Sequence, residues 1–133
     1  MLTRVATIPP TRVLVIEDDP VVRTLMAAAL ADAGYQVDEA GDSGAAVRLI
    51  DGDGYKLMIT DMNVPGDLDG LQLAHHANQE DPDLPVVFVT GRHEVLNRLR
   101  RASIPGAALA KPFDLETLVE VVGRLIEERL SAA

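Results

Sequence analysis

Short apolar runs alternate with segments of helical periodicity along most of the chain, and this alternation constrains the fold more than any other feature of the sequence. The apolar runs predict strands over 12–16, 35–40, 56–60, 86–89 and 107–110. Helical spacing of apolar residues in the remaining segments predicts helices over 20–33, 43–50, 70–80, 93–102 and 115–130. Strands that alternate with helices form a parallel sheet with helices on both faces. We therefore expect one doubly wound α/β domain of the (βα)5 type.

The length and composition favour a single small domain. A chain of 133 residues can bury a core without covalent cross-links, and the absence of cysteine excludes disulfides and thiolate chemistry. We expect residues 1–11 to be a disordered lead, residues 12–130 to form the domain and residues 131–133 to be a tail. No apolar run approaches the ~20 residues that span a bilayer. The first residues also lack the apolar segment of a secretory signal, so a cytoplasmic location is expected.

The chain is acidic, with a formal net charge of −9 at pH 7 and lysine only at positions 56 and 111. Such a surface repels the phosphate backbone of nucleic acids, so broad nucleic-acid binding is not expected. An excess of carboxylates instead suits a site for a cation.

Four of the predicted strands end in a side chain that can bind a ligand or react. The first ends in Glu17-Asp18-Asp19, the third in Asp61, the fourth in Thr90 and the fifth in Lys111. Each of these residues alone is common in loops. The carboxyl ends of parallel strands, however, lie at one edge of the sheet, and ligands bind at that edge in folds of this class. We therefore expect these side chains to meet.

The residue types at this edge favour phosphoryl transfer to a carboxylate. Adjacent buried carboxylates repel one another, and a divalent cation relieves that repulsion. Because no histidine or cysteine stands at these strand ends, the oxygen ligands favour Mg²⁺. Asp61 could bind the metal with one oxygen and attack phosphorus with the other, which gives an acyl phosphate. The metal and Lys111 would balance charge on the phosphoryl oxygens, and Thr90 offers a hydroxyl donor to one of them.

Four segments, in this order and spacing, resemble the receiver domain of two-component response regulators over residues 12–130. They are VLVIEDDP, MITDMNVPGDLDG, VVFVTG and AKPF. The resemblance implies a flavodoxin-like sheet of strand order 2-1-3-4-5. It also implies that Asp61 is the phosphoacceptor. Glu17 and Asp18 match the acidic pair that holds Mg²⁺, and Asn63 matches the position that gives the metal a backbone carbonyl.

The resemblance assigns the remaining site residues as well. Thr90 matches the switch hydroxyl and Lys111 the lysine that pairs with the phosphate, and the Lys111-Pro112 bond is expected to be cis. Asn63 and Arg92 match positions that line the approach of water, so they should tune hydrolysis. Such a domain catalyses its own phosphorylation and dephosphorylation without being a classical enzyme.

The implied function is a phosphorylation-dependent signalling switch. The phosphoryl donor would be a sensor histidine kinase or a histidine phosphotransfer protein. Because no DNA-binding region follows residue 130, we expect output by contact with a downstream protein, without direct DNA or membrane binding. Arginines at 92, 98, 100 and 101 form either a solvated helix face or a docking surface. That surface would serve an acidic partner, or a homodimer through the fourth and last helices.

Two features of the sequence depart from the family pattern. The family usually has an aromatic switch residue three positions before the lysine, and here that position is Ala108. We therefore expect output mainly through the Thr90 loop and the fourth helix. The loop from Asp61 to Gly70 is one residue longer than the common pattern, which could place Asp67 or Asp69 near the site.

Other functions fit the sequence less well. A phosphate-independent interaction module remains an alternative because of Ala108. An aspartyl phosphohydrolase would need an Asp-x-Asp motif after the first strand and a cap over the substrate, and a flavin protein would need a phosphate-cradling loop. His75-His76 is expected to be a surface pair, since neighbouring helix residues do not share a face.

Local signals also predict helix ends. We expect Asp19 to cap the first helix, Ser43 the second and Asp114 the last. Gly34 suits the end of the first helix.

Overall fold

The computed structural model describes residues 10–52, 54–92, 97–99 and 101–132. Its parallel strands form one sheet of order β2-β1-β3-β4-β5, as the family resemblance implied. The strands are β1 (Arg12–Ile16), β2 (Gln36–Ala40), β3 (Leu57–Asp61), β4 (Val86–Thr90) and β5 (Gly106–Ala110). The helices with complete descriptions are α1 (Pro20–Asp32), α2 (Ser43–Gly52), α3 (Gly70–Glu80) and α5 (Leu115–Ala132). The predicted α/β fold is confirmed.

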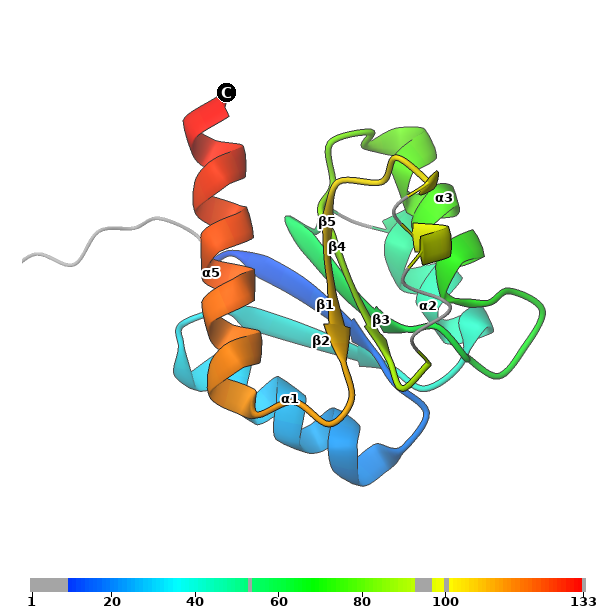
Figure 1. Ribbon diagram of the computed structural model, residues 1–133, viewed down its shortest axis with the longest axis horizontal. Helices are drawn as coiled ribbons and strands as arrows, with labels where there is room; N and C mark the ends of the chain where they lie inside the picture. The colour runs from blue at the N-terminus through cyan, green and yellow to red at the C-terminus, as the bar shows by residue number, and fades with distance from the viewer. Residues whose placement is uncertain (1–9, 53, 93–96, 100, 133) are drawn as a thin grey trace, which may run out of the picture.

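The helices cover both faces of the sheet (Figure 1). On one face, α1 and α5 pack over side chains such as Val13, Ile59 and Val87. On the other, α2 and α3 pack over the alternate side chains of the same strands, such as Leu14 and Met58. Two hydrophobic cores, one on each side of the sheet, therefore hold the strands in place.

Burial along the strands follows their position in the sheet. From Val13 to Ile16 in β1, from Leu57 to Thr60 in β3 and along all of β4, every residue is buried, as expected for central strands covered on both faces. The edge strand β2 has only Ala40 fully buried, and β5 alternates between exposed and half-buried residues. The strands that carry Glu17, Asp61 and Thr90 on or just beyond their ends are thus the most completely buried.

Most of the predicted helix ends are confirmed, with one correction. Asp19 accepts hydrogen bonds from the first turn of α1, and Asp114 Oδ1 accepts one from the Thr117 N–H of α5 at 2.9 Å. The prediction that Ser43 caps α2 is wrong. Asp42 Oδ1 accepts the Ala45 N–H at 2.8 Å instead, and the Ser43 side chain is buried against the loop after β3.

The remaining differences concern segment bounds. Helix α2 continues to Gly52, and α5 continues to Ala132, into the segment expected to be a tail. The predicted helix over 93–102 lies partly outside the described residues, as does most of the lead over 1–11. Among the described residues, no helix combines the length and the apolar character that crossing a bilayer requires.

Candidate functional site

The acidic residues predicted at the sheet edge do meet. Strands β1 and β3 are neighbours, with Ile16 paired to Thr60, so Glu17 and Asp61 follow paired residues at one edge of the sheet. One carboxylate oxygen from each of Glu17, Asp18 and Asp61 lies within 4.8 Å of the others. Glu17 is buried, Asp61 is half-buried and Asp18 is exposed. The cluster therefore runs from the protein interior to the solvent.

Lys111 supplies positive charge to this cluster. Its ammonium donates a hydrogen bond to Asp61 Oδ2 at 2.7 Å and lies 3.7 Å from Glu17 Oε2. The backbone holds it in place, because the Lys111 N–H donates to the Thr90 carbonyl at 2.8 Å. The Lys111-Pro112 peptide is cis, as expected. One cation thus faces three carboxylates.

Backbone N–H groups donate hydrogen bonds to the side-chain oxygens of Asp61 and Thr90 and so orient both side chains. The Asn63 N–H donates to Asp61 Oδ1 at 3.1 Å, so both oxygens of this carboxylate have a defined partner. Thr90 is 4% exposed and stands one residue beyond Val89, the partner of Asp61 in the sheet. Its hydroxyl accepts the Arg92 N–H at 3.1 Å and keeps its own proton to donate.

Burial, hydrogen bonding and neighbouring charges shift two pKa values in the cluster. Burial raises the pKa of Glu17 to about 7, and a hydrogen bond with the Asp61 side chain adds to the rise, while Lys111 opposes it. Burial lowers the pKa of Lys111, but the hydrogen bond and the charge of Asp61 outweigh this and leave it raised. Lys111 is therefore a cation at neutral pH. At the same pH, and without a bound metal ion, Glu17 is protonated in part of the molecules.

The cluster suits Mg²⁺. Its ligand atoms are carboxylate oxygens, which Mg²⁺ prefers, and they lie within 4.8 Å of one another. Glu17, Asp18 and Asp61 could hold the ion. Neither Asp67 nor Asp69 belongs to this acidic cluster, and Asp69 instead caps α3.

Two residues that the sequence analysis did not assign to the site shape the loop after β3. A Cβ atom on Gly70 would lie 2.2 Å from the Asp61 carbonyl oxygen, so only glycine allows α3 to begin this close to β3. The Ser43 hydroxyl accepts the Leu68 N–H at 3.3 Å, and the Ser43 N–H donates to the Pro65 carbonyl at 2.8 Å. A glycine at a helix start gave a weak signal for the first contact; nothing local indicated the second.

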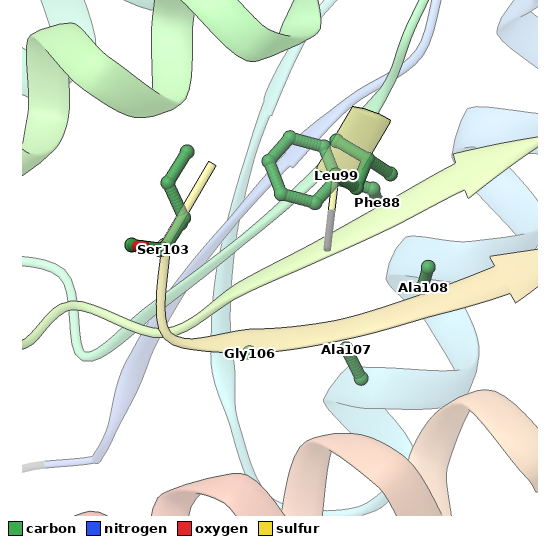
Figure 2. Close-up of a pocket in the computed structure, with 7 residues that line it drawn as sticks. Phe88, Leu99, Ser103, Gly106, Ala107 and Ala108 are labelled. Atoms are coloured by element: carbon green, nitrogen blue, oxygen red, sulfur yellow. The ribbon is translucent and has the colours of Figure 1, made fainter. Parts of the chain in front are cut away.

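The departure at position 108 leaves open space beside β5. Ala108 pairs with Phe88 of β4 and is exposed. Figure 2 shows Ala108 on the same side of β5 as Phe88 and Leu99, whereas Ala107 points to the opposite side. A cavity of about 310 Å³ opens among these residues. A methyl group therefore stands where the family resemblance would place an aromatic ring.

Comparisons with known proteins identify the family. The family described as the response regulator receiver domain matches residues 13–123. The response regulator receiver protein CpdR of Brucella abortus is 34% identical over 116 residues, which are 86% of this chain and 96% of CpdR. The chain therefore belongs to the receiver domain family of two-component response regulators.

Other relatives extend beyond the matched region. The transcriptional regulatory protein TcrA of Mycobacterium tuberculosis is 36% identical over 110 residues, which are 80% of this chain and 42% of TcrA. The DNA-binding transcriptional regulator NtrC of a Bradyrhizobium strain is 34% identical over 122 residues, which are 25% of NtrC. The chain thus spans less than half the length of these regulators.

Solved structures agree with this assignment. A CheY-like receiver domain protein from Methanospirillum hungatei superposes with a TM-score of 0.86 at 24% identity, over 94% of this chain and all of that one, which shows the shared fold. The response regulator TrrA of Thermotoga maritima, solved in complex with Mg²⁺-BeF, gives a TM-score of 0.77 at 28% identity. That match covers 86% of this chain and 98% of TrrA.

The raised pKa of Glu17 predicts how pH and Mg²⁺ act together on stability. Between its ordinary pKa of 4.5 and the folded value of about 7, the folded state keeps a proton that the unfolded state has lost. Without metal, the free energy of unfolding should therefore fall as pH rises through this window. Mg²⁺ should raise the melting temperature more at about pH 8 than at about pH 6, since the metal binds the ionised carboxyl.

Thermal unfolding of Glu17→Gln checks this prediction. The variant should lose most of the pH-dependent decline, whereas Asp67→Asn, which changes an exposed acid of the neighbouring loop, should keep it. Equal increments from Mg²⁺ at both pH values in the unmodified protein would contradict the assignment of Glu17 to the metal site.

Proposed function

We propose that this receiver domain is a phosphorylation-dependent signalling switch in which Asp61 accepts a phosphoryl group. The observation that carries the proposal is the Asp61 carboxylate held 2.7 Å from the Lys111 ammonium, within the cluster that includes Glu17 and Asp18. A sensor histidine kinase or a histidine phosphotransfer protein would supply the group. The cytoplasmic location expected from the sequence remains a prediction.

The transfer is a displacement at phosphorus. An oxygen of Asp61 forms a bond to phosphorus while the bond from phosphorus to the donor histidine nitrogen breaks. The imidazole leaves with the electron pair and takes a proton from solvent. The product is an acyl phosphate on Asp61, a group that carries about −1.5 to −2 charges where the ionised carboxylate carried about −1.

The residues around Asp61 would stabilise the charge of the transferred group. Lys111 already donates a hydrogen bond to Asp61 Oδ2, and its ammonium can form an ion pair with the new phosphoryl oxygens. The Thr90 hydroxyl can donate a hydrogen bond to one of these phosphoryl oxygens. Glu17, Asp18 and Asp61, with the Asn63 carbonyl as a further proposed ligand, would hold Mg²⁺, whose charge would add to that of Lys111 in stabilising the phosphoryl oxygens. The similar response regulator TrrA was solved in complex with Mg²⁺-BeF, which supports the proposal of a Mg²⁺ site here.

The label from a small phosphodonor tests the assignment. Acetyl phosphate with Mg²⁺ should phosphorylate the protein, and Asp61→Asn should abolish the label because the amide is not a nucleophile of this kind. Asp67→Asn leaves Asp61 and Lys111 intact and should keep the label. Mass spectrometry of the intact proteins measures both outcomes, and phosphate retained on Asp61→Asn would contradict the proposal.

We further propose that output depends on the loop after β4 rather than on an aromatic residue of β5. Thr90 is buried at the end of β4, and its hydroxyl holds the Arg92 N–H, so a hydroxyl drawn toward a phosphoryl group would release this loop. Ala108 offers no ring to follow the movement. A downstream partner would recognise the altered surface, or a second copy of the chain would bind it and form a homodimer through the fourth and last helices.

Hydrogen exchange with and without beryllofluoride, a mimic of the bound phosphoryl group, tests this route. Exchange protection over residues 90–102 should change when the mimic and Mg²⁺ bind, and Thr90→Ala should reduce that change. Unaltered protection over this segment, in a protein that binds the mimic at Asp61, would favour the alternative of a phosphate-independent interaction module.

A further inference from the structure

The backbone of Glu17 lies just beyond the last paired residue of β1, so its polar groups need partners outside the ladder with β3. Its N–H donates to the Ala40 carbonyl of β2 at 3.0 Å. Its carbonyl accepts a hydrogen bond from Nη1 of Arg23 at 2.8 Å. Because the Glu17 residue is 3% exposed, the direction of its carboxylate depends on how this backbone is held.

Arg23 is held from several sides. It belongs to α1, and its backbone N–H donates to the Asp19 carbonyl at 2.9 Å. Its Nε lies 3.4 Å from Glu39 Oε1 at the end of β2. A Cβ atom on Gly41 would lie 2.8 Å from Nη1, so the glycine leaves room for the guanidinium. A planar group with several donors can make these contacts together, which the single ammonium of a lysine cannot.

We propose that Arg23 is a positioning residue for the metal site, since it locks the Glu17 carbonyl and thereby aims the Glu17 carboxylate at Asp18 and Asp61. Residues behind metal ligands commonly change metal affinity by 10-fold or more when they are lost. The inference rests on the proposed function, because it concerns the ion that this function requires.

A second arginine provides a control for a purely structural role. Nη2 of Arg12 bonds Asp38 Oδ2 at 2.6 Å, so Arg12 also joins β1 to β2, but from the first residue of β1 to the middle of β2. Replacing either arginine by methionine removes a contact at the β1–β2 edge. Only the Arg23 substitution removes a hydrogen bond from the backbone carbonyl of a proposed metal ligand.

Mg²⁺ affinity, measured by calorimetry on the full chain, separates the two roles. Arg23→Met should raise the Kd for Mg²⁺ by about 10-fold or more. Arg12→Met should leave the Kd within about 2-fold while lowering the melting temperature. Glu39→Gln keeps the hydrogen bond from Arg23 to the Glu17 carbonyl, so its Kd should remain near that of the unmodified protein. The Kd of Arg23→Lys should lie between those of the unmodified protein and Arg23→Met. At saturating Mg²⁺, Arg23→Met should recover most of its labelling by acetyl phosphate.

The outcomes distinguish this inference from the proposed function. An unchanged Kd in Arg23→Met, or an equal increase in Arg12→Met, would overturn the positioning role while leaving phosphorylation of Asp61 intact. Failure of the unmodified protein to bind Mg²⁺ would overturn both. If Arg23→Met does not fold, the Kd of Arg23→Lys decides, and a value equal to that of the unmodified protein would overturn the inference.

Discussion

Repulsion among three carboxylates at the junction of β1 and β3 is the constraint on which the rest of the site depends. Glu17, Asp18 and Asp61 bring oxygens within 4.8 Å of one another, and Glu17 is buried where a negative charge is poorly solvated. Burial and the hydrogen bond with Asp61 raise the pKa of Glu17 to about 7, although the charge of Lys111 opposes the rise. Such a cluster is stabilised by a cation and by ligands that bring one, which is the property that a Mg²⁺-dependent phosphoryl acceptor needs.

The fold maintains this crowding by fixing the backbone rather than the side-chain tips. The central strands are buried on both faces, Gly70 lets α3 start against the Asp61 carbonyl, and Lys111 is tied to β4 through the Thr90 carbonyl. Each reactive group therefore stands on a segment with little freedom to move away. Under the proposed function, phosphorylation would instead break a hydrogen bond in a loop, the one between the Thr90 hydroxyl and the Arg92 N–H.

The sequence predicted the sheet, its helices and the meeting of Glu17, Asp18, Asp61 and Lys111, because apolar periodicity and the rule for strand ends are local and repeated signals. It could not predict contacts made between distant segments. Asp42 and Ser43 are both able to cap α2, and the choice between them depends on a loop 25 residues away that takes the Ser43 hydroxyl. The contact between Arg23 and the Glu17 carbonyl likewise depends on how α1 leaves the sheet, which periodicity does not specify.

The most direct test of the central claim is to locate the acyl phosphate chemically. Borohydride reduces an aspartyl phosphate to the corresponding alcohol, so treatment of the phosphorylated protein should convert residue 61 to homoserine, found by peptide mass spectrometry. The account predicts this change at position 61 and only when Mg²⁺ was present during phosphorylation. A reduced residue at position 17, 18 or 19 instead, or none in a protein that carries the phosphoryl label, would contradict it.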